Sequence, residues 1–176
     1  MSPGSADSPL VSVMCFRPGL ALAVARVAPD PATHAAIAAR WLSGAEHTRS
    51  ARFVVDHARA DFLAGRVAAK TAARALQPEG PPPHAWEILR GEHQQPLIAH
   101  AFPGRAVSLA HSGGVGLALV HDACHRCGVD LERADRGAGD AIATQVAPSE
   151  AEWARAGGVE METRWLLLWT AREAQG

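Results

Sequence analysis

Lysine, cysteine and long apolar runs are scarce in this sequence, and each scarcity excludes something. Lys70 is the only lysine, so nearly every fixed positive charge is an arginine, which suits bidentate phosphate contacts and equally fits a GC-rich genome. The three cysteines, Cys15, Cys124 and Cys127, are too few for a disulfide framework and favour a reducing compartment. We therefore expect a cytoplasmic protein.

No segment approaches the ~20 apolar residues that a transmembrane helix needs. The apolar run of residues 10–16 lacks the basic leader of a signal peptide. The net charge is only -1 and the basic residues are spread along the 176-residue chain, which is not the electrostatic pattern of a nucleic-acid-binding protein. We expect a soluble protein without nucleic-acid or membrane partners, in which any anionic ligand is bound by a local group of side chains.

The order of apolar and polar segments predicts a mixed α+β fold. Residues 1–19 resemble a disordered tail, residues 20–27 a strand, and the Ala-rich residues after Pro31 a helix. Residues 45–76 predict a long amphipathic helical stretch with one break, and four prolines make residues 77–84 a loop. Residues 107–110 and 115–120 predict two strands joined by a Ser-Gly-Gly turn. Residues 149–156 and 160–174 predict two further helices.

Asp130 and Glu132 are candidate metal ligands. If this segment is a strand, the two carboxylates project on the same side and Leu131 on the other. Hard divalent cations prefer carboxylate oxygens, so the pair would make half of a magnesium site. By itself the pattern is explained more simply by a solvent-facing strand edge.

His111 and Ser112 are candidates for binding an anion. They stand at a predicted strand end beside two glycines, where backbone N–H groups can approach a phosphate closely. A hydrogen-bonded turn histidine is the simpler alternative. The residues around Ser112 do not form the G-x-S-x-G pattern of a serine hydrolase.

Cys124 and Cys127 form a C-x-x-C pair with His121 and His125 beside it. This spacing raises the alternative of a zinc site, which would need His121 and a distant fourth ligand. A turn that happens to carry thiols explains the pair more simply.

Three segments occur in a characteristic order: Val-Ser-Leu-Ala-His-Ser-Gly-Gly at 107–114, Gly-Val-Asp-Leu-Glu at 128–132, and Trp-Thr-Ala-Arg-Glu-Ala at 169–174. Together they resemble the signature segments of the 4'-phosphopantetheinyl transferases, in particular the surfactin-synthetase-activating type. Residues 43–65 also resemble the basic coenzyme-binding segment of that family, and residues 92–98 resemble its Gly-Lys-Pro loop. The resemblance covers residue 20 to the C-terminus.

The resemblance implies a fold of two similar α+β subdomains, here residues 20–105 and 106–176, that meet at a cleft for coenzyme A. It implies that Arg49 and Arg59 contact the 3'-phosphate. His111 and Ser112 would lie at the phosphates, with His111 also counted among the catalytic residues.

The same resemblance assigns Mg²⁺ to Asp130, Glu132 and Glu173, with Glu173 also helping to deprotonate the acceptor serine. The implied reaction moves 4'-phosphopantetheine from coenzyme A to a serine of an acyl or peptidyl carrier protein and releases 3',5'-ADP. Gln95 and Ala110 depart from the family, which commonly has a phosphate-contacting lysine and a serine at these places.

The family pattern continues beyond Gly176 with a lysine and further strands. We therefore expect the second subdomain to be incomplete, so that the chain is a fragment or is completed by a partner. An inactive remnant that binds coenzyme A or a carrier protein is the alternative, and a zinc-binding interaction module is the second alternative.

Overall fold

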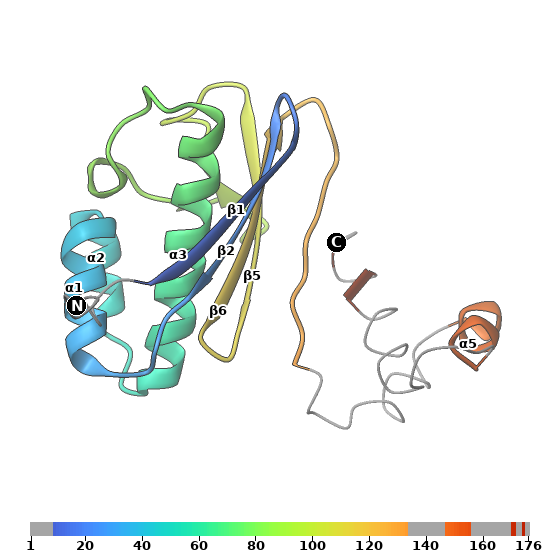
Figure 1. The fold of residues 1–176 in the computed structure, drawn as a ribbon, viewed down its shortest axis with the longest axis horizontal. Helices are drawn as coiled ribbons and strands as arrows, with labels where there is room; N and C mark the ends of the chain where they lie inside the picture. Colours follow the sequence, from blue (N-terminus) through green and yellow to red (C-terminus); the bar gives the residue numbers. More distant parts are fainter. Residues whose placement is uncertain (1–8, 134–146, 156–169, 172–173, 175–176) are drawn as a thin grey trace, which may run out of the picture.

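The computed structural model describes residues 9–133, 147–155, 170–171 and 174. These residues form a mixed α+β structure, as the sequence predicts. Figure 1 shows its main body as a sheet with α3 across one face and α1 and α2 beyond α3. None of the helices in these ranges is both long enough and apolar enough to cross a membrane.

The main sheet has four antiparallel strands in the order β1-β2-β6-β5. Their bounds are Leu10–Arg17 for β1, Leu20–Arg26 for β2, Arg105–Ser112 for β5 and Val115–Asp122 for β6. The hairpin of β5 and β6 turns at Gly113 and Gly114, whose φ angles of 60° and 77° suit the two-residue turn that joins twisted strands. The predicted strand-turn-strand unit is therefore confirmed.

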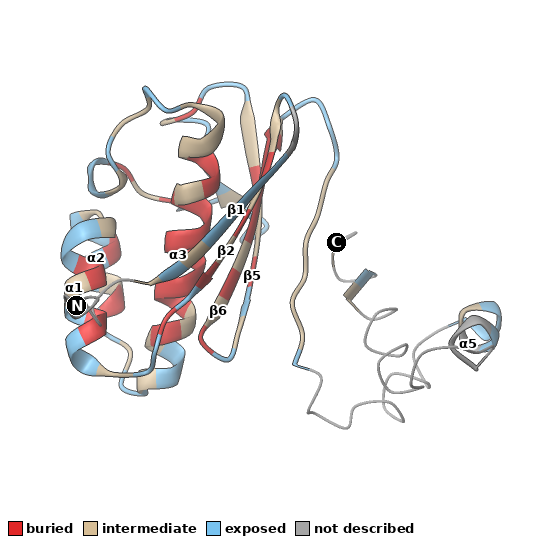
Figure 2. Cartoon of the chain, in the orientation of Figure 1, coloured by how far each residue is buried: buried red, intermediate tan, exposed pale blue. Residues whose placement is uncertain are grey.

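The helix α3, Asp56–Leu76, lies against this sheet, and Figure 2 shows buried residues along both. Small residues fill the space between them. Ala21, Ala23 and Ala25 of β2 are fully buried, and so are Ala64 and other alanines of the helix. The closest approach is at Gly116 of β6, where an added Cβ would lie 2.2 Å from the carbonyl carbon of Ala64. Because no side chain separates the two backbones there, the hairpin end is held directly against the first half of α3.

Two shorter helices cover the other side of α3. Helix α1, Pro31–Trp41, begins with Asp30 accepting a hydrogen bond from the Thr33 N–H at 2.9 Å, and with a proline in its first turn. Helix α2, Gly44–Ser50, begins with a capping box between Ser43 and Glu46. The predicted helical stretch of residues 45–76 is thus confirmed as two helices, with the break at residues 51–55.

A buried ionic network joins α2 to α3. Glu46 accepts hydrogen bonds from Lys70 at 2.5 Å and from the Ile88 N–H at 3.0 Å, and its other charged neighbour is Arg66 at 3.1 Å. Arg66 also stacks over the Phe62 ring at 4.6 Å from its centroid. Burial lowers the pKa of Arg66 to about 10, and the charge of Glu46 opposes this shift.

The remaining elements are short. They are η1 at Pro83–Ala85, β3 at Leu89–Arg90, β4 at Pro96–Leu97 and α5 at Pro148–Arg155. Strands β3 and β4 pair with each other outside the main sheet. Helix α5 matches the helix that the capping-box spacing predicts from residue 149.

Two sequence-based expectations differ from the structure. Residues Leu10–Arg17, placed in the tail, form β1 because they pair along the free edge of β2. The subdomain boundary between residues 105 and 106 falls where β5 begins, inside one continuous sheet. Strands from both sides of that boundary therefore pack on the same helix, α3, through the same core.

Candidate functional site

His111, Asp130 and Glu132 come from two separate sequence motifs and line one cavity of about 630 Å³. The cavity lies where the start of α3, the end of β5 and residues 130–133 meet. Its ionisable side chains are His57, Asp61, His111, Asp130, Glu132 and Arg133. The structure therefore brings the candidate phosphate-binding and metal-binding residues together.

The position of His111 is fixed by β5 and by a glycine of α3. His111 pairs with Gly116 of β6 and lies on the sheet face that meets the helix. A Cβ added to Gly65 would be 3.3 Å from the Cδ2 atom of His111, so the absence of a side chain at Gly65 leaves room for the imidazole ring. Ser112 follows at the rim, half-buried, and lines this cavity and a second one on the far side of the turn.

Asp130 and Glu132 lie in an irregular segment, not in the strand that the sequence suggested. This segment runs beside β5, where the Val129 N–H donates a hydrogen bond to the Ser108 hydroxyl at 3.0 Å. This bond joins a backbone N–H to a side chain, so it is not part of a backbone ladder. The two carboxylates nevertheless line the same cavity.

The electrostatics of the cavity favour a cation. Asp61, Asp130 and Glu132 supply three carboxylates against one guanidinium, that of Arg133. The Oδ2 atom of Asp130 is buried and has no hydrogen-bond partner in the described part of the chain. Because a buried carboxylate oxygen without a partner is costly, a hard divalent cation bound here would stabilise it. The carboxylates thus fit Mg²⁺ chemically, although no three His, Cys, Asp or Glu side chains within the described ranges are grouped closely enough to hold a metal ion.

Glu173 lies outside the described residues, but its neighbour Ala174 is described. A Cβ added to Gly128 would lie 1.6 Å from the Ala174 carbonyl oxygen, so the two backbones are in direct contact. Ala174 also lines a cavity with Cys127 and Gly128. The third sequence motif therefore approaches the second motif two residues before Asp130.

Arg49 and Arg59 do not line this cavity. Arg49 sits over Phe62 at 5.7 Å from the ring centroid, and burial, followed by the nearby charge of Arg90, lowers its pKa. Arg59 donates a hydrogen bond to the Phe53 carbonyl at 2.6 Å. It lines a separate cavity of about 260 Å³ with His34 and His47, and its buried Nε atom has no hydrogen-bond partner among the described residues.

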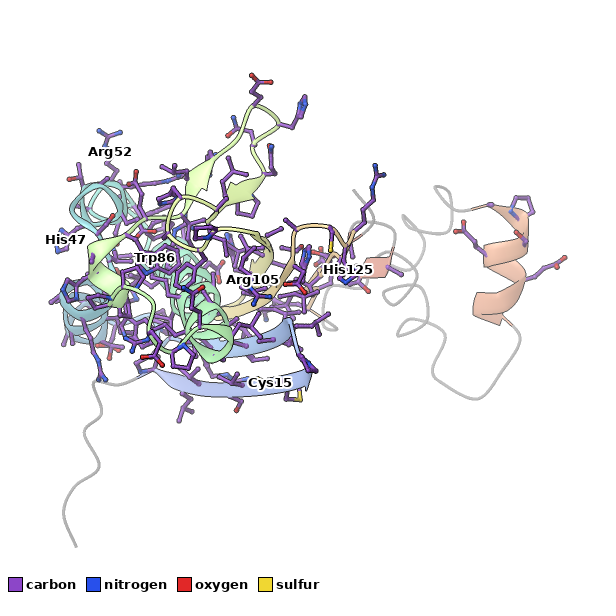
Figure 3. All side chains as sticks on the ribbon, turned by 90° about the horizontal axis from the view of Figure 1, so that it is seen from above. Cys15, His47, Arg52, Trp86, Arg105 and His125 are labelled. Atoms are coloured by element: carbon purple, nitrogen blue, oxygen red, sulfur yellow. The ribbon has the colours of Figure 1, made fainter. Side chains whose placement is uncertain are left out.

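The C-x-x-C pair contains free thiols. Cys124 is exposed and Cys127 is half-buried. His121, the third ligand that the zinc alternative needs, is buried, and its Nδ1 atom lies 2.9 Å from the Asp122 carbonyl oxygen. Figure 3 shows His125 on the segment after β6, apart from Cys15 on β1.

His57 and Asp61 are site residues that the sequence reasoning did not identify. They lie one turn apart on α3, and both line the cavity of His111. Their spacing of four residues is a signal that can be read from the sequence. It gains meaning only once α3 is known to meet the β5–β6 turn.

A scan against models of protein families finds no match to the chain, and a search of curated proteins finds no significant match.

Proposed function

We propose that the protein transfers the 4'-phosphopantetheine moiety of coenzyme A to a serine of an acyl or peptidyl carrier protein. The observation that carries this proposal is the shared cavity of His111, Asp130 and Glu132, with the buried Oδ2 atom of Asp130, which has no hydrogen-bond partner among the described residues. The contact of Ala174 with Gly128 adds support, because it brings the motif of Glu173 to that of Asp130. The finer fold we propose is the two-subdomain fold of the 4'-phosphopantetheinyl transferases, with a division other than the one between residues 105 and 106, where the main sheet is continuous.

In the reaction, the serine oxygen forms a bond to the β-phosphorus of coenzyme A and the bond to the departing 3',5'-ADP breaks. The serine proton leaves to a base, for which we propose Glu173. Asp130 and Glu132 hold Mg²⁺, with Glu173 as the third carboxylate. When bound, this ion neutralises charge on the pyrophosphate.

The other residues of the cavity bind and orient the substrate. His111 lies at the rim of the cavity and is exposed, so an N–H of its ring can donate a hydrogen bond to a phosphate. Ser112 stands beside a turn of two glycines whose backbone can approach the ligand closely. Orientation of the phosphorus for in-line attack is the main contribution that such groups make to phosphoryl transfer.

Arg49 and Arg59 are the residues that we propose for the 3'-phosphate. Both are half-buried arginines on adjacent helices, and the Nε atom of Arg59 lacks a hydrogen-bond partner in the described structure. Charge-assisted contacts to a phosphate would satisfy such groups.

The proposal is tested by incubating the purified protein with coenzyme A, Mg²⁺ and an apo carrier protein, and measuring the intact mass of the carrier. Addition of the phosphopantetheine arm supports the transferase. If several carriers remain unmodified while coenzyme A still binds, the inactive remnant becomes the better description.

A further inference from the structure

The first turns of α3 hold the turn between β5 and β6. Asp61 lies on α3 and lines the same cavity as His111. Its Oδ1 atom accepts a hydrogen bond from the Gly114 N–H at 2.5 Å. Such a bond to an ionised carboxylate is about twice as strong as one between neutral groups.

Gly114 is held from its other side as well. Its carbonyl oxygen accepts a hydrogen bond from the Val27 N–H at 2.8 Å. Its φ angle is 77°, and an added Cβ would lie 2.7 Å from the Val27 carbonyl oxygen. The turn is therefore fastened between α3 and the end of β2, and no side chain fits at Gly114.

These contacts lie close to the residues proposed to bind the phosphates. His111 and Ser112 directly precede the turn. Gly113 packs beside the Arg133 side chain, because a Cβ added to Gly113 would lie 3.3 Å from the Cδ atom of Arg133. A shift of the turn would thus move one wall of the cavity relative to Asp130 and Glu132. Misplacement of a reacting group by about 1 Å can reduce the rate by about 100-fold.

We propose that Asp61 is a positioning residue, which through Gly114 fixes His111 and Ser112 against the metal-binding carboxylates. This role rests on the proposed transferase function. Asp61 acts as a hydrogen-bond acceptor and does not touch the transferred group, so a neutral acceptor of the same shape serves in its place.

The hydrogen bond itself is tested without any transfer reaction. Amide hydrogen exchange of Gly114 is measured by NMR in the full chain and in the variants Asp61→Ala, Asp61→Asn and Asp56→Ala. Asp56 is the control, because it lies on the first turn of α3 and does not line the cavity. We expect Gly114 to be protected in the unmodified chain and to exchange about 10- to 100-fold faster in Asp61→Ala.

Asp61→Asn keeps an acceptor but loses the charge that makes this bond about twice as strong, so its exchange should rise by only about 3- to 10-fold. Asp56→Ala should leave Gly114 unchanged. The proposal is overturned if the Gly114 amide is unprotected in the unmodified chain, or if it exchanges at the same rate in the unmodified chain and in Asp61→Ala. The protection of Gly114 in the unmodified chain can be measured even if Asp61→Ala does not fold.

Transfer kinetics then test the consequence. Asp61→Ala should lower kcat by about 100-fold, while Asp61→Asn retains most of it. Equal loss in both variants would identify an ionised catalytic group and overturn the positioning role. If the unmodified chain transfers nothing, the transferase proposal fails, while the exchange data still decide whether Asp61 holds the turn.

Discussion

The Nζ atom of Lys70 lies 2.5 Å from the Oε2 atom of Glu46, and both side chains are buried. Lys70 also donates to the carbonyl oxygens of Trp41, Pro83 and Trp86 at 2.7 to 2.9 Å. Its ammonium group lies over the buried ring of Trp86, 4.9 Å from the ring centroid; Trp86 is labelled in Figure 3. The single lysine of the chain therefore joins α2, α3 and the loop before β3.

Replacing Lys70 by methionine should be strongly destabilising. The substitution leaves Glu46 buried with one cation fewer and three carbonyls without their donor, so the free energy of unfolding should fall by about 3 to 5 kcal/mol. Urea denaturation measures it. Arg74→Met is the control on the same helix, since the one hydrogen bond of the half-buried Arg74 within the described ranges is a 3.5 Å contact with the Pro78 carbonyl. A loss for Lys70→Met no larger than the control's would contradict the network.

Gly116→Ala should disrupt the packing of the sheet on α3. The new methyl group would lie 2.2 to 2.4 Å from backbone atoms of Ala64 and Gly65, so β6 and α3 must separate. Overpacking of this kind costs about 1 to 3 kcal/mol or more. Gly44→Ala is the matched control, because nothing lies within 4 Å of its added methyl group. Equal melting temperatures for the two variants would contradict the close approach of helix and sheet.

Asp30 should make stability sensitive to acid. The hydrogen bonds from Thr33 hold the pKa of Asp30 below its ordinary value of 3.8. The carboxyl of Asp30 therefore binds a proton less readily in the folded state than in the unfolded state. The stability that the ionised cap contributes is present above pH 3.8 and is lost as the pH falls through the lower pKa of the folded state. Asp30→Asn keeps the cap but does not titrate. Below pH 3.8 the melting temperature of the unmodified chain should thus fall more steeply with pH than that of Asp30→Asn. Parallel curves of melting temperature against pH would refute this.

Asp130→Asn should weaken divalent-cation binding. The substitution removes one of the carboxylates of the cavity, and an amide oxygen is a poorer partner for a hard cation. Mn²⁺ titration, followed by electron paramagnetic resonance, should show at least about a tenfold loss of affinity. Asp122→Asn serves as the control, since Asp122 pairs with Arg105 and does not line the cavity. Similar affinities for both variants would argue against a cation at Asp130.

The helices and the hairpin of this fold are predictable because their signals are local. The Ser-Gly-Gly turn predicts the reversal between β5 and β6, and the apolar stripe predicts α3. The strand β1 is not predictable in the same way, because its pairing depends on the free edge of β2, and the Pro- and Gly-rich residues around it resemble a tail. The partnership of Glu46 with Lys70 spans 24 residues and likewise appears only in the folded chain.

The candidate site shows the same division. The motifs of His111 and of Asp130 are visible in the sequence, and their juxtaposition follows from the resemblance. Asp61 escaped notice because a carboxylate on an amphipathic helix looks like part of its solvent-facing side. Only the contact with Gly114 shows that it faces the hairpin. The hydrogen bond from the Val129 N–H to the Ser108 hydroxyl, just before the candidate metal ligand Asp130, is likewise visible only in the folded chain.

The most direct test of the central claim is the intact mass of an apo carrier protein after incubation with this protein, coenzyme A and Mg²⁺. Our account predicts a mass increase by one phosphopantetheine arm, abolished by Asp130→Ala and retained by the control Asp122→Ala. An unchanged carrier mass across acyl and peptidyl carriers, or an increase that Asp130→Ala leaves intact, would contradict the account.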